Sequence, residues 1–209
     1  MAIEPFNDEY FEHYAFFDYS KESKYDSAYN RFMGNLNIYQ VIFSLYKSIF
    51  NKIPEHYVDL GCGTGEEMAW YQAKNVGVIG CDISPYVLAR KNQLVADYIH
   101  EMDSITLMSK YAHKADVIMD STLQYLEDDD FNKLMKLIEE KSAEQCVFGI
   151  VFDETERNHP YRKQFHPVEY WHSKIAEYGF KTARDYVNGI FISKQVEEAT
   201  KEYIFVKGI

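Results

Sequence analysis

A strand-like segment that runs into a glycine-rich turn and then into a helical segment constrains the fold of this chain more than any other feature. The segment reads YVDLGCGTGEE over residues 57–67, with glycine at positions 61, 63 and 65. Glycine adopts backbone conformations that other residues avoid, and it lets a ligand approach without a Cβ in the way. The spacing is GxGxG, whereas proteins that bind a dinucleotide pyrophosphate carry GxGxxG. The pattern predicts a strand, a ligand-binding turn and a helix.

Short apolar runs alternate with longer amphipathic stretches from residue 56 onward. Strands are expected at residues 56–60, 76–82, 98–102, 115–120 and 145–153, and helices at 37–51, 65–74, 84–96, 129–142 and 168–178. Two more strand-like tracts, at 181–187 and 202–207, are close enough for an antiparallel pair at the sheet edge. This alternation predicts an α/β fold with a seven-stranded, mostly parallel sheet and helices on both faces.

The length and the distribution of aromatic residues bear on domain organisation. A chain of 209 residues fits one hydrophobic core. Fourteen of its 34 aromatic residues lie within residues 1–50, and no Pro/Gly/Ser linker follows them. We therefore expect residues 1–52 to form a helical aromatic cap packed on the main domain, residues 53–209.

Charge and cysteine content exclude several classes of function. The formal charge of −11 disfavours nucleic acids and anionic membranes as partners. The N-terminus lacks the features of a secretory signal, and the apolar stretch at 38–50 is too short to span a bilayer. Three cysteines without a CxxC pair argue against disulfides and against a structural metal site. We expect a cytoplasmic protein without a bound metal.

Three acidic residues fall where a nucleoside would meet the expected sheet. Asp59 precedes the glycine turn, Asp82 ends the next strand and Asp103 follows the strand after that. Asp59 can hold a cationic group, Asp82 can accept both hydroxyls of a ribose, and Asp103 can meet an adenine amino group. Glu66 and Glu67, at the start of the helix, would repel a pyrophosphate. The acids predict a nucleoside cofactor that is not a diphosphate.

Four segments together resemble the class I S-adenosylmethionine-dependent methyltransferases. They are VDLGCGTGEE from residue 58, VIGCDISPYVLARKN from 78, MDSI from 102 and ADVIMDSTLQYL from 115. The resemblance covers residues 55–153 closely and the remainder loosely. It implies that the cofactor is S-adenosylmethionine and that the activity is methyl transfer.

The resemblance also implies roles for individual residues. The turn, with Gly61, Cys62, Gly63 and Gly65, surrounds the methionine part of the cofactor, Asp82 binds the ribose, Ile83 contacts the adenine face, Asp103 and Ser104 contact its edge, and Asp120 lies beside the methionine or the acceptor. Asp97 competes with Asp103, which we prefer because it lies 13 residues before Asp116, the usual separation in the family. In similar small methyltransferases an N-terminal segment closes over the cofactor, which brings Tyr25 or Arg31 to its carboxylate. The alternative is that the N-terminal aromatic residues only cover the core.

Candidate general bases lie near the edge where an acceptor enters. His159 and His166 belong to a long polar loop, residues 153–167, and histidine titrates close to neutral pH. Tyr125, after the strand at 115–120, is a third candidate. The competing interpretation is that the histidines are solvated loop residues and that Tyr125 is a packing residue.

The sequence thus predicts methyl transfer by in-line displacement to an oxygen or nitrogen of a small-molecule acceptor. The chain lacks the Asn/Asp-Pro-Pro-Tyr motif of DNA adenine methyltransferases, which argues against base methylation. The alternatives are an RNA or protein methyltransferase, a non-catalytic S-adenosylmethionine-binding subunit, and a nicotinamide-dependent oxidoreductase, which the glycine spacing disfavours. The sequence leaves a homodimer open.

Overall fold

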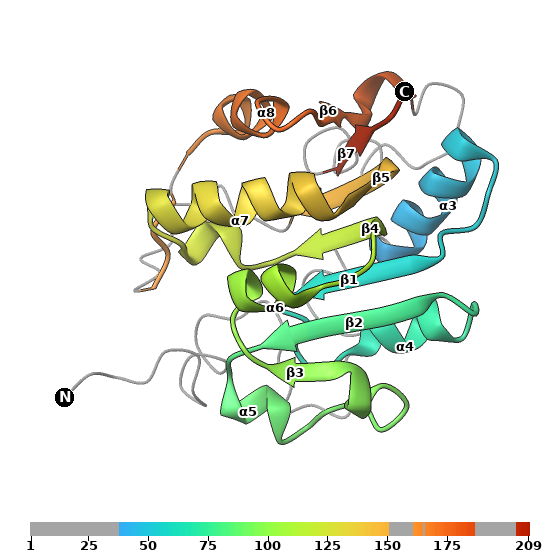
Figure 1. Ribbon diagram of the computed structural model, residues 1–209, viewed down its shortest axis with the longest axis vertical. Coiled ribbons are helices and arrows are strands. Elements are labelled where there is room, and N and C mark those ends of the chain that lie inside the picture. Colours follow the sequence, from blue (N-terminus) through green and yellow to red (C-terminus); the bar gives the residue numbers. More distant parts are fainter. Residues whose placement is uncertain (1–37, 151–160, 165, 187–203) are drawn as a thin grey trace.

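A seven-stranded sheet forms the centre of the protein (Figure 1). The computed structural model describes residues 38–150, 161–164, 166–186 and 204–209. The strands are β1 (His56–Leu60), β2 (Gly77–Asp82), β3 (Ile99–Glu101), β4 (Ala115–Asp120), β5 (Ser142–Ile150), β6 (Lys181–Thr182) and β7 (Ile204–Lys207). Their order is β3-β2-β1-β4-β5-β7-β6, and β7 runs antiparallel to both of its neighbours. The prediction of a mostly parallel sheet with an antiparallel edge pairing is confirmed.

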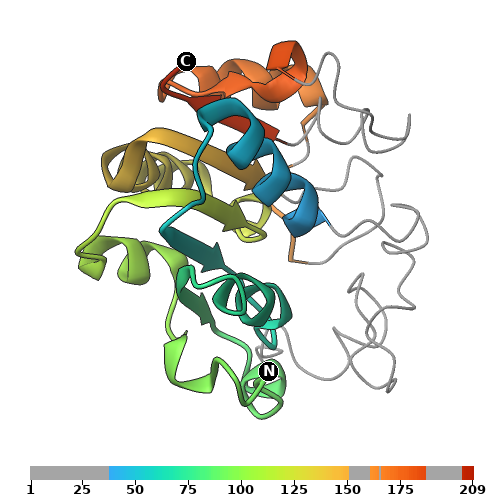
Figure 2. The same ribbon diagram turned by 90° about the vertical axis from the view of Figure 1, so that its right-hand side faces the viewer.

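Helices cover both faces of the sheet, as the sequence predicts. They are α3 (Ile38–Phe50), α4 (Glu66–Gln72), α5 (Pro85–Leu88), α6 (Ser104–Lys110), α7 (Asp128–Lys141) and α8 (Val168–Ala176), with short 3₁₀ helices η2 (Ala96–Tyr98), η3 (Leu123–Tyr125) and η4 (Ala183–Tyr186). Figure 2 shows the sheet edge-on, with α3 and α4 on one side and α6 and α7 on the other. None of the helices in the described ranges is long and apolar enough to cross a membrane.

The core on the first face is built by α3 and α4. Ile42, Leu45 and Tyr46 of α3 are almost fully buried and pack in one cluster with Val117 and Val147 of the sheet. The spacing of three and four residues puts these side chains on one face of the helix. The helix expected at 37–51 therefore belongs to the main core.

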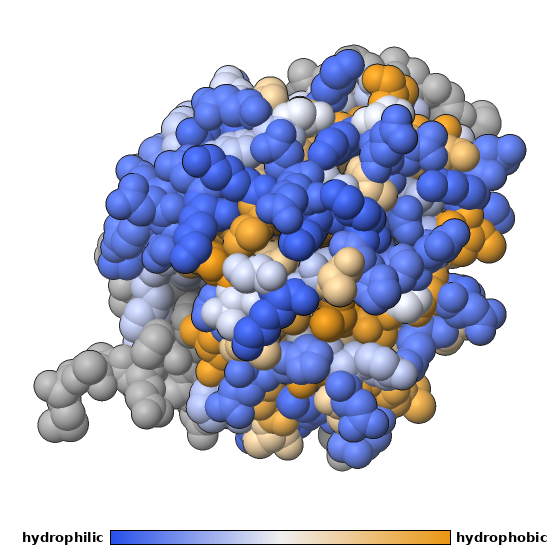
Figure 3. Space-filling view, in the orientation of Figure 1, coloured by the Kyte–Doolittle hydropathy of each residue, from blue (hydrophilic) through white to orange (hydrophobic). Residues whose placement is uncertain are grey.

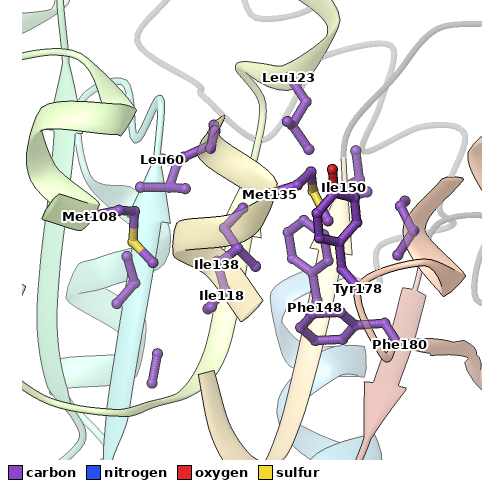
Figure 4. Packing of buried hydrophobic residues seen from close by; sticks show 14 of the residues in the cluster. Leu60, Met108, Ile118, Leu123, Met135, Ile138, Phe148, Ile150, Tyr178 and Phe180 are labelled. Carbon is purple, nitrogen blue, oxygen red and sulfur yellow. The ribbon is translucent and has the colours of Figure 1, made fainter. Parts of the chain in front are cut away.

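The core on the second face joins α6, α7 and α8 to the other side of the same strands. Figure 4 shows Met135 and Ile138 of α7 among residues from the strands, including Ile118 and Phe148. The outward face of α7 is polar, and the surface above this helix is mostly hydrophilic (Figure 3). Both faces of β4 are buried, so the strand reads as a nearly continuous apolar run.

Two helices differ from the sequence-based expectation. The helix expected at 84–96 ends at Leu88. Asn92 N, which would donate to Leu88 O in a continuing helix, donates instead to Thr64 O over 2.8 Å. The helix α6 was not expected at all. Asp103 caps it by accepting a hydrogen bond from Thr106 N, so the acid that we interpreted as a ligand-binding residue is also a helix-start signal.

The strand order identifies the edge of the sheet at which a ligand is expected to bind. Leu60, at the end of β1, lies in register with Cys81 of β2 and with Asp120 of β4. The strands β1 to β4 are parallel, and their arrowheads point to the left in Figure 1. The connections diverge between β1 and β4, and a crevice at the carboxyl ends beside such a switch point is the usual binding place in open α/β sheets.

Candidate functional site

The glycine turn after β1 is held open by backbone and side-chain contacts. Gly61, Gly63 and Gly65 all have positive φ values, of 79°, 55° and 84°. The N–H groups of Gly61 and Cys62 both donate to Cys81 O, each over 2.9 Å. The Ser121 hydroxyl donates to Gly61 O over 2.9 Å, and a Cβ at position 61 would collide with this hydroxyl. The turn is therefore fixed to both neighbouring strands, β2 and β4.

Asp82 is bound to this turn at the end of β2. Its Oδ2 accepts from Gly63 N over 3.0 Å and its Oδ1 accepts from Ser84 N over 2.8 Å. Burial raises the pKa of Asp82, and the backbone hydrogen bonds oppose that rise. Each carboxylate oxygen has a second lone pair, so both can still accept from a ribose hydroxyl. Ile83 is next in the chain and 47% exposed, as an apolar residue that contacts a flat ring would be.

Asp59 forms a small cluster with Glu67 and with Tyr57, a residue that the sequence did not single out. Tyr57 and Asp59 point to the same side of β1, since side chains alternate along a strand. The Tyr57 hydroxyl lies 3.1 Å from Asp59 Oδ2 and 3.1 Å from Glu67 Oε2. Burial and the charge of Glu67 raise the pKa of Asp59 well above its ordinary value, and burial raises the pKa of Glu67 to about 7. We interpreted Glu67 only as a barrier to pyrophosphate, and the structure makes it a partner of Asp59.

Asp120 is the third buried acid at this edge. Its Oδ1 accepts from the N–H groups of Thr122 and Leu123, both over 2.7 Å, and its Oδ2 accepts from the Thr122 hydroxyl. Burial raises the pKa of Asp120 to about 6. The carboxylate thus sets the path of the chain after β4, where the expected methionine part or acceptor would lie.

Asp103 and Ser104 lie at the carboxyl end of β3. The Asp103 carboxylate accepts from Thr106 N over 2.8 Å and from the Thr106 hydroxyl over 2.6 Å. Partial burial works in the opposite direction, but these hydrogen bonds lower the pKa of Asp103. Ser104 is buried, and its hydroxyl lies 3.0 Å from that of Thr122. Asp97 precedes β3 and therefore lies at the amino ends of the parallel strands β2 and β3, whereas Asp82 and Asp103 lie at their carboxyl ends. The topology favours Asp103 as the adenine-edge candidate.

Only some of the candidate general bases lie within the described residues. His159, Tyr25 and Arg31 lie outside them, as do most of the N-terminal aromatic residues. The His166 ring stacks on Tyr170 at 3.8 Å between centroids, and its Nε2 lies 3.0 Å from Gln164 Oε1. Tyr125 lies in η3, directly after β4. The structure therefore gives His166 a packed surrounding, unlike that of a solvated loop histidine.

Gln124 is a second polar residue that the sequence did not single out. It is 4% exposed, its Nε2 lies 3.5 Å from Ser121 O, and its Oε1 has no hydrogen-bond partner among the described residues. Its main-chain oxygen accepts from Lys163 N and Gln164 N, which ties residues 163–164 to the turn after β4. The only signal in the sequence is a polar residue within the apolar run after this strand.

Within the described residues, none of the ion pairs reaches the acids of this site. The lysine ion pairs within the described ranges involve Asp116, Glu127, Glu140 and Glu177, none of which belongs to this edge. The carboxylates of Asp59, Asp82 and Asp120 repel one another. The charges of Asp82 and Asp120 therefore raise the pKa of Asp59 further. A ligand with a positive charge relieves this repulsion, and a phosphate increases it.

Comparison with known proteins agrees with this geometry. Residues 58–141 match a family model described as a methyltransferase domain. No curated protein sequence matches the chain significantly. Among solved structures, the plantazolicin methyltransferase BamL, in complex with a desmethyl plantazolicin analogue and S-adenosylhomocysteine (SAH), has a TM-score of 0.60 and 15% identity, over 87% of this chain and 86% of that one.

Two further structures share the fold. The 1,6-didemethyltoxoflavin-N1-methyltransferase of Burkholderia thailandensis has a TM-score of 0.54 and 16% identity, over 80% of this chain and 76% of that one. The N-methyltransferase NodS of Bradyrhizobium japonicum has a TM-score of 0.55 and 18% identity, over 85% and 94%. Over residues 58–141 the chain is thus similar to methyltransferase domains, and it shares the α/β fold of the S-adenosylmethionine-dependent methyltransferases found among the solved structures.

Proposed function

We propose that the protein transfers a methyl group from S-adenosylmethionine to an oxygen or nitrogen of a small-molecule acceptor. The observation that carries the proposal is the cluster of acids around the glycine turn, in which the charges of Glu67, Asp82 and Asp120 act on Asp59. S-adenosylmethionine offers this edge an ammonium and a sulfonium, and it has no phosphate. The opposite charges attract over the short distances of a buried site, where water screens them little.

The residues at this edge fit separate parts of the cofactor. We assign Asp82 to the ribose hydroxyls, Ile83 to the adenine face, and Asp103 with Ser104 to the adenine edge. The turn from Gly61 to Gly65 and Asp59 would hold the aminoacyl part, and Asp120 would lie near the methyl group. The acids act by binding and orienting, because transfer from a sulfonium requires mainly in-line placement of the nucleophile.

Two observations support a small acceptor. The formal charge of −11 disfavours RNA and DNA as partners. Two of the similar structures are a plantazolicin methyltransferase in complex with a desmethyl analogue and a 1,6-didemethyltoxoflavin-N1-methyltransferase with bound 1,6-didemethyltoxoflavin. A general base is needed only for an acceptor that is protonated at working pH, and His166, His159 and Tyr125 remain the candidates. We further propose that the part of the expected cap that precedes α3 closes over the cofactor, with Tyr25 or Arg31 at its carboxylate.

The test is transfer of an isotope-labelled methyl group from S-adenosylmethionine to sets of phenols, carboxylates and amines, with total RNA and a protein extract in parallel. We expect label on at least one small molecule. Asp82→Ala is expected to lower the rate at subsaturating cofactor by at least about tenfold, since it removes hydrogen bonds to a charged group. Asp97→Ala, an exposed acid close by in the chain, is the matched control and should retain the rate.

Two other outcomes would contradict parts of the proposal. Label on RNA or on protein alone contradicts the small-molecule acceptor. Cofactor binding without transfer to any acceptor contradicts the assignment of an enzyme and favours a non-catalytic cofactor-binding subunit.

A further inference from the structure

The hydroxyl of Tyr57 lies between two carboxyl groups. It is 3.1 Å from Asp59 Oδ2 and 3.1 Å from Glu67 Oε2. A phenol has one hydrogen to donate, so it can satisfy one carboxylate only. The second contact is a hydrogen bond only if the other carboxyl is protonated and donates to the phenol oxygen. A Tyr57 phenolate does not resolve the conflict, because burial and the neighbouring acids raise the pKa of Tyr57 well above its ordinary value.

Two neighbouring side chains with a hydrogen to donate, those of Tyr71 and Cys62, direct it away from the pair. Tyr71 of α4 stacks on Tyr57 with 3.9 Å between centroids, and its hydroxyl donates to Tyr39 O. The Cys62 thiol of the turn donates a hydrogen bond to Gly63 O.

The remaining charged groups at this place are acids. Asp82 of β2 and Asp120 of β4 both raise the pKa of Asp59. Glu66, next to Glu67 in α4, accepts a hydrogen bond from the Asn92 side chain. Within the described residues, burial and the charges of Asp82 and Asp120 thus favour retention of a proton by the pair, and the hydrogen bond from Tyr57 opposes it.

We propose that Asp59 and Glu67 share one proton through the Tyr57 hydroxyl while the site is empty, and that the ammonium group of the cofactor displaces this proton into solvent. Glu67 is then a positioning residue of the cofactor site that acts through Tyr57. The inference rests on the proposed function, because it places the aminoacyl part of the cofactor at Asp59. No covalent bond of the ligand changes: an ammonium enters and one proton leaves to the buffer.

The geometry gives the ammonium a place to bind. Asp59 is 5% exposed, and within the described residues only its Oδ2 takes a hydrogen bond, so Oδ1 is left to accept one. An ammonium at Oδ1 stabilises the ionised carboxylate. The Tyr57 hydroxyl can then donate to either ionised neighbour, and the pair no longer needs its extra proton.

The experiment is calorimetric titration of the full chain with SAH at about pH 6.5, in buffers of different ionisation enthalpy and equal ionic strength. SAH carries the ammonium but no sulfonium charge, and an α-amino group with a pKa near 7.7–8.0 is already protonated at that pH. We expect release of close to one proton per ligand bound. The affinity should rise as the pH rises, by up to about tenfold per pH unit below the pKa of the pair.

One ligand and two variants separate this source of protons from others. Methylthioadenosine lacks the ammonium and should bind without proton release. Glu67→Gln should abolish the release and flatten the pH dependence, whereas Glu66→Gln, its neighbour in the same helical turn, should leave both unchanged. Circular dichroism checks that each variant is folded.

The outcomes are distinguishable from failure of the proposed function. Binding of SAH to the wild-type protein without proton release would overturn the shared proton and leave the cofactor assignment intact. Release that persists in folded Glu67→Gln would also overturn it, and would point to Asp120 instead. Failure of the folded wild-type protein to bind either SAH or methylthioadenosine would contradict the proposed function itself.

Discussion

At the scale of single residues, the site is a set of buried polar groups with unequal hydrogen bonding. Gln164 is buried, and its Nε2 donates to Leu126 O over 2.9 Å and to Asp128 Oδ1 over 3.0 Å. Gln124 is equally buried, but within the part of the chain that the structure describes its Oε1 has no partner and its Nε2 makes only a long contact of 3.5 Å. A buried acceptor without a donor lowers stability, so Gln124 is better explained by a ligand or a water molecule than by the fold.

This contrast predicts opposite effects for one substitution at two positions. Gln124→Met is expected to leave the free energy of unfolding unchanged or raise it by about 1 kcal/mol, because an unsatisfied amide is replaced by an apolar chain. Gln164→Met is expected to lower it by about 1–3 kcal/mol, because it leaves buried partners unpaired. Urea unfolding of both variants measures the difference. A loss of stability in Gln124→Met as large as that in Gln164→Met would contradict this interpretation.

At the scale of elements, the glycine turn is where the backbone of the chain is most constrained. Gly61 and Gly179 have nearly the same φ, 79° and 81°, but differ in their surroundings. A Cβ at position 61 would collide with Ser121 and lie 2.8 Å from Thr122 Cγ2, whereas a Cβ at position 179 would meet no atom within 4 Å. The two glycines therefore separate the cost of the backbone conformation from the cost of the close approach.

Alanine at these positions tests the close approach. Gly179→Ala, at the end of α8, should lower the free energy of unfolding by about 1 kcal/mol through the positive φ alone. Gly61→Ala carries the same cost and also forces β4 away from the turn, so we expect a loss of at least about 3 kcal/mol. Thermal unfolding of the two variants provides the comparison. Equal losses would show that the turn tolerates a Cβ.

Most elements were predicted from hydrophobic periodicity, and the exceptions depend on individual hydrogen bonds that periodicity does not report. The strand at 115–120 and the helix at 168–178 were predicted to within two residues, because their apolar patterns are strong. The helix expected at 84–96 was wrong beyond Leu88, since Asn92 N donates to Thr64 O, a contact between segments distant in the sequence. The role of Glu67 was missed because it depends on Tyr57, ten residues earlier in the chain, and no local pattern reports that contact.

At the scale of the whole molecule, the stability depends on pH through acids whose pKa values are raised in the folded protein. Burial raises the pKa of Glu67 to about 7 and that of Asp120 to about 6. These acids hold their protons more tightly in the folded protein than in the unfolded chain. Their contribution to stability is therefore fully present below about pH 4, the unfolded pKa, and is lost as the pH rises to about 7.

Glu67→Gln should remove part of this pH dependence. At about pH 5 the variant and the wild-type protein should be similarly stable, because Glu67 is protonated in the folded protein. At about pH 8 the variant should be more stable by about 1 kcal/mol, because the wild-type protein holds a buried charge there. Denaturant unfolding at both pH values measures this change. A variant that is less stable than the wild-type protein at about pH 8 would show that ionised Glu67 stabilises the fold.

The most direct measurement for the central claim is calorimetric titration of the wild-type protein, Asp82→Ala and Asp97→Ala with S-adenosylmethionine, SAH and NAD. The account predicts one-to-one binding of the first two ligands, with affinity reduced at least about tenfold in Asp82→Ala and retained in Asp97→Ala. Absence of binding by the folded wild-type protein, or tighter binding of NAD than of S-adenosylmethionine, would contradict the account.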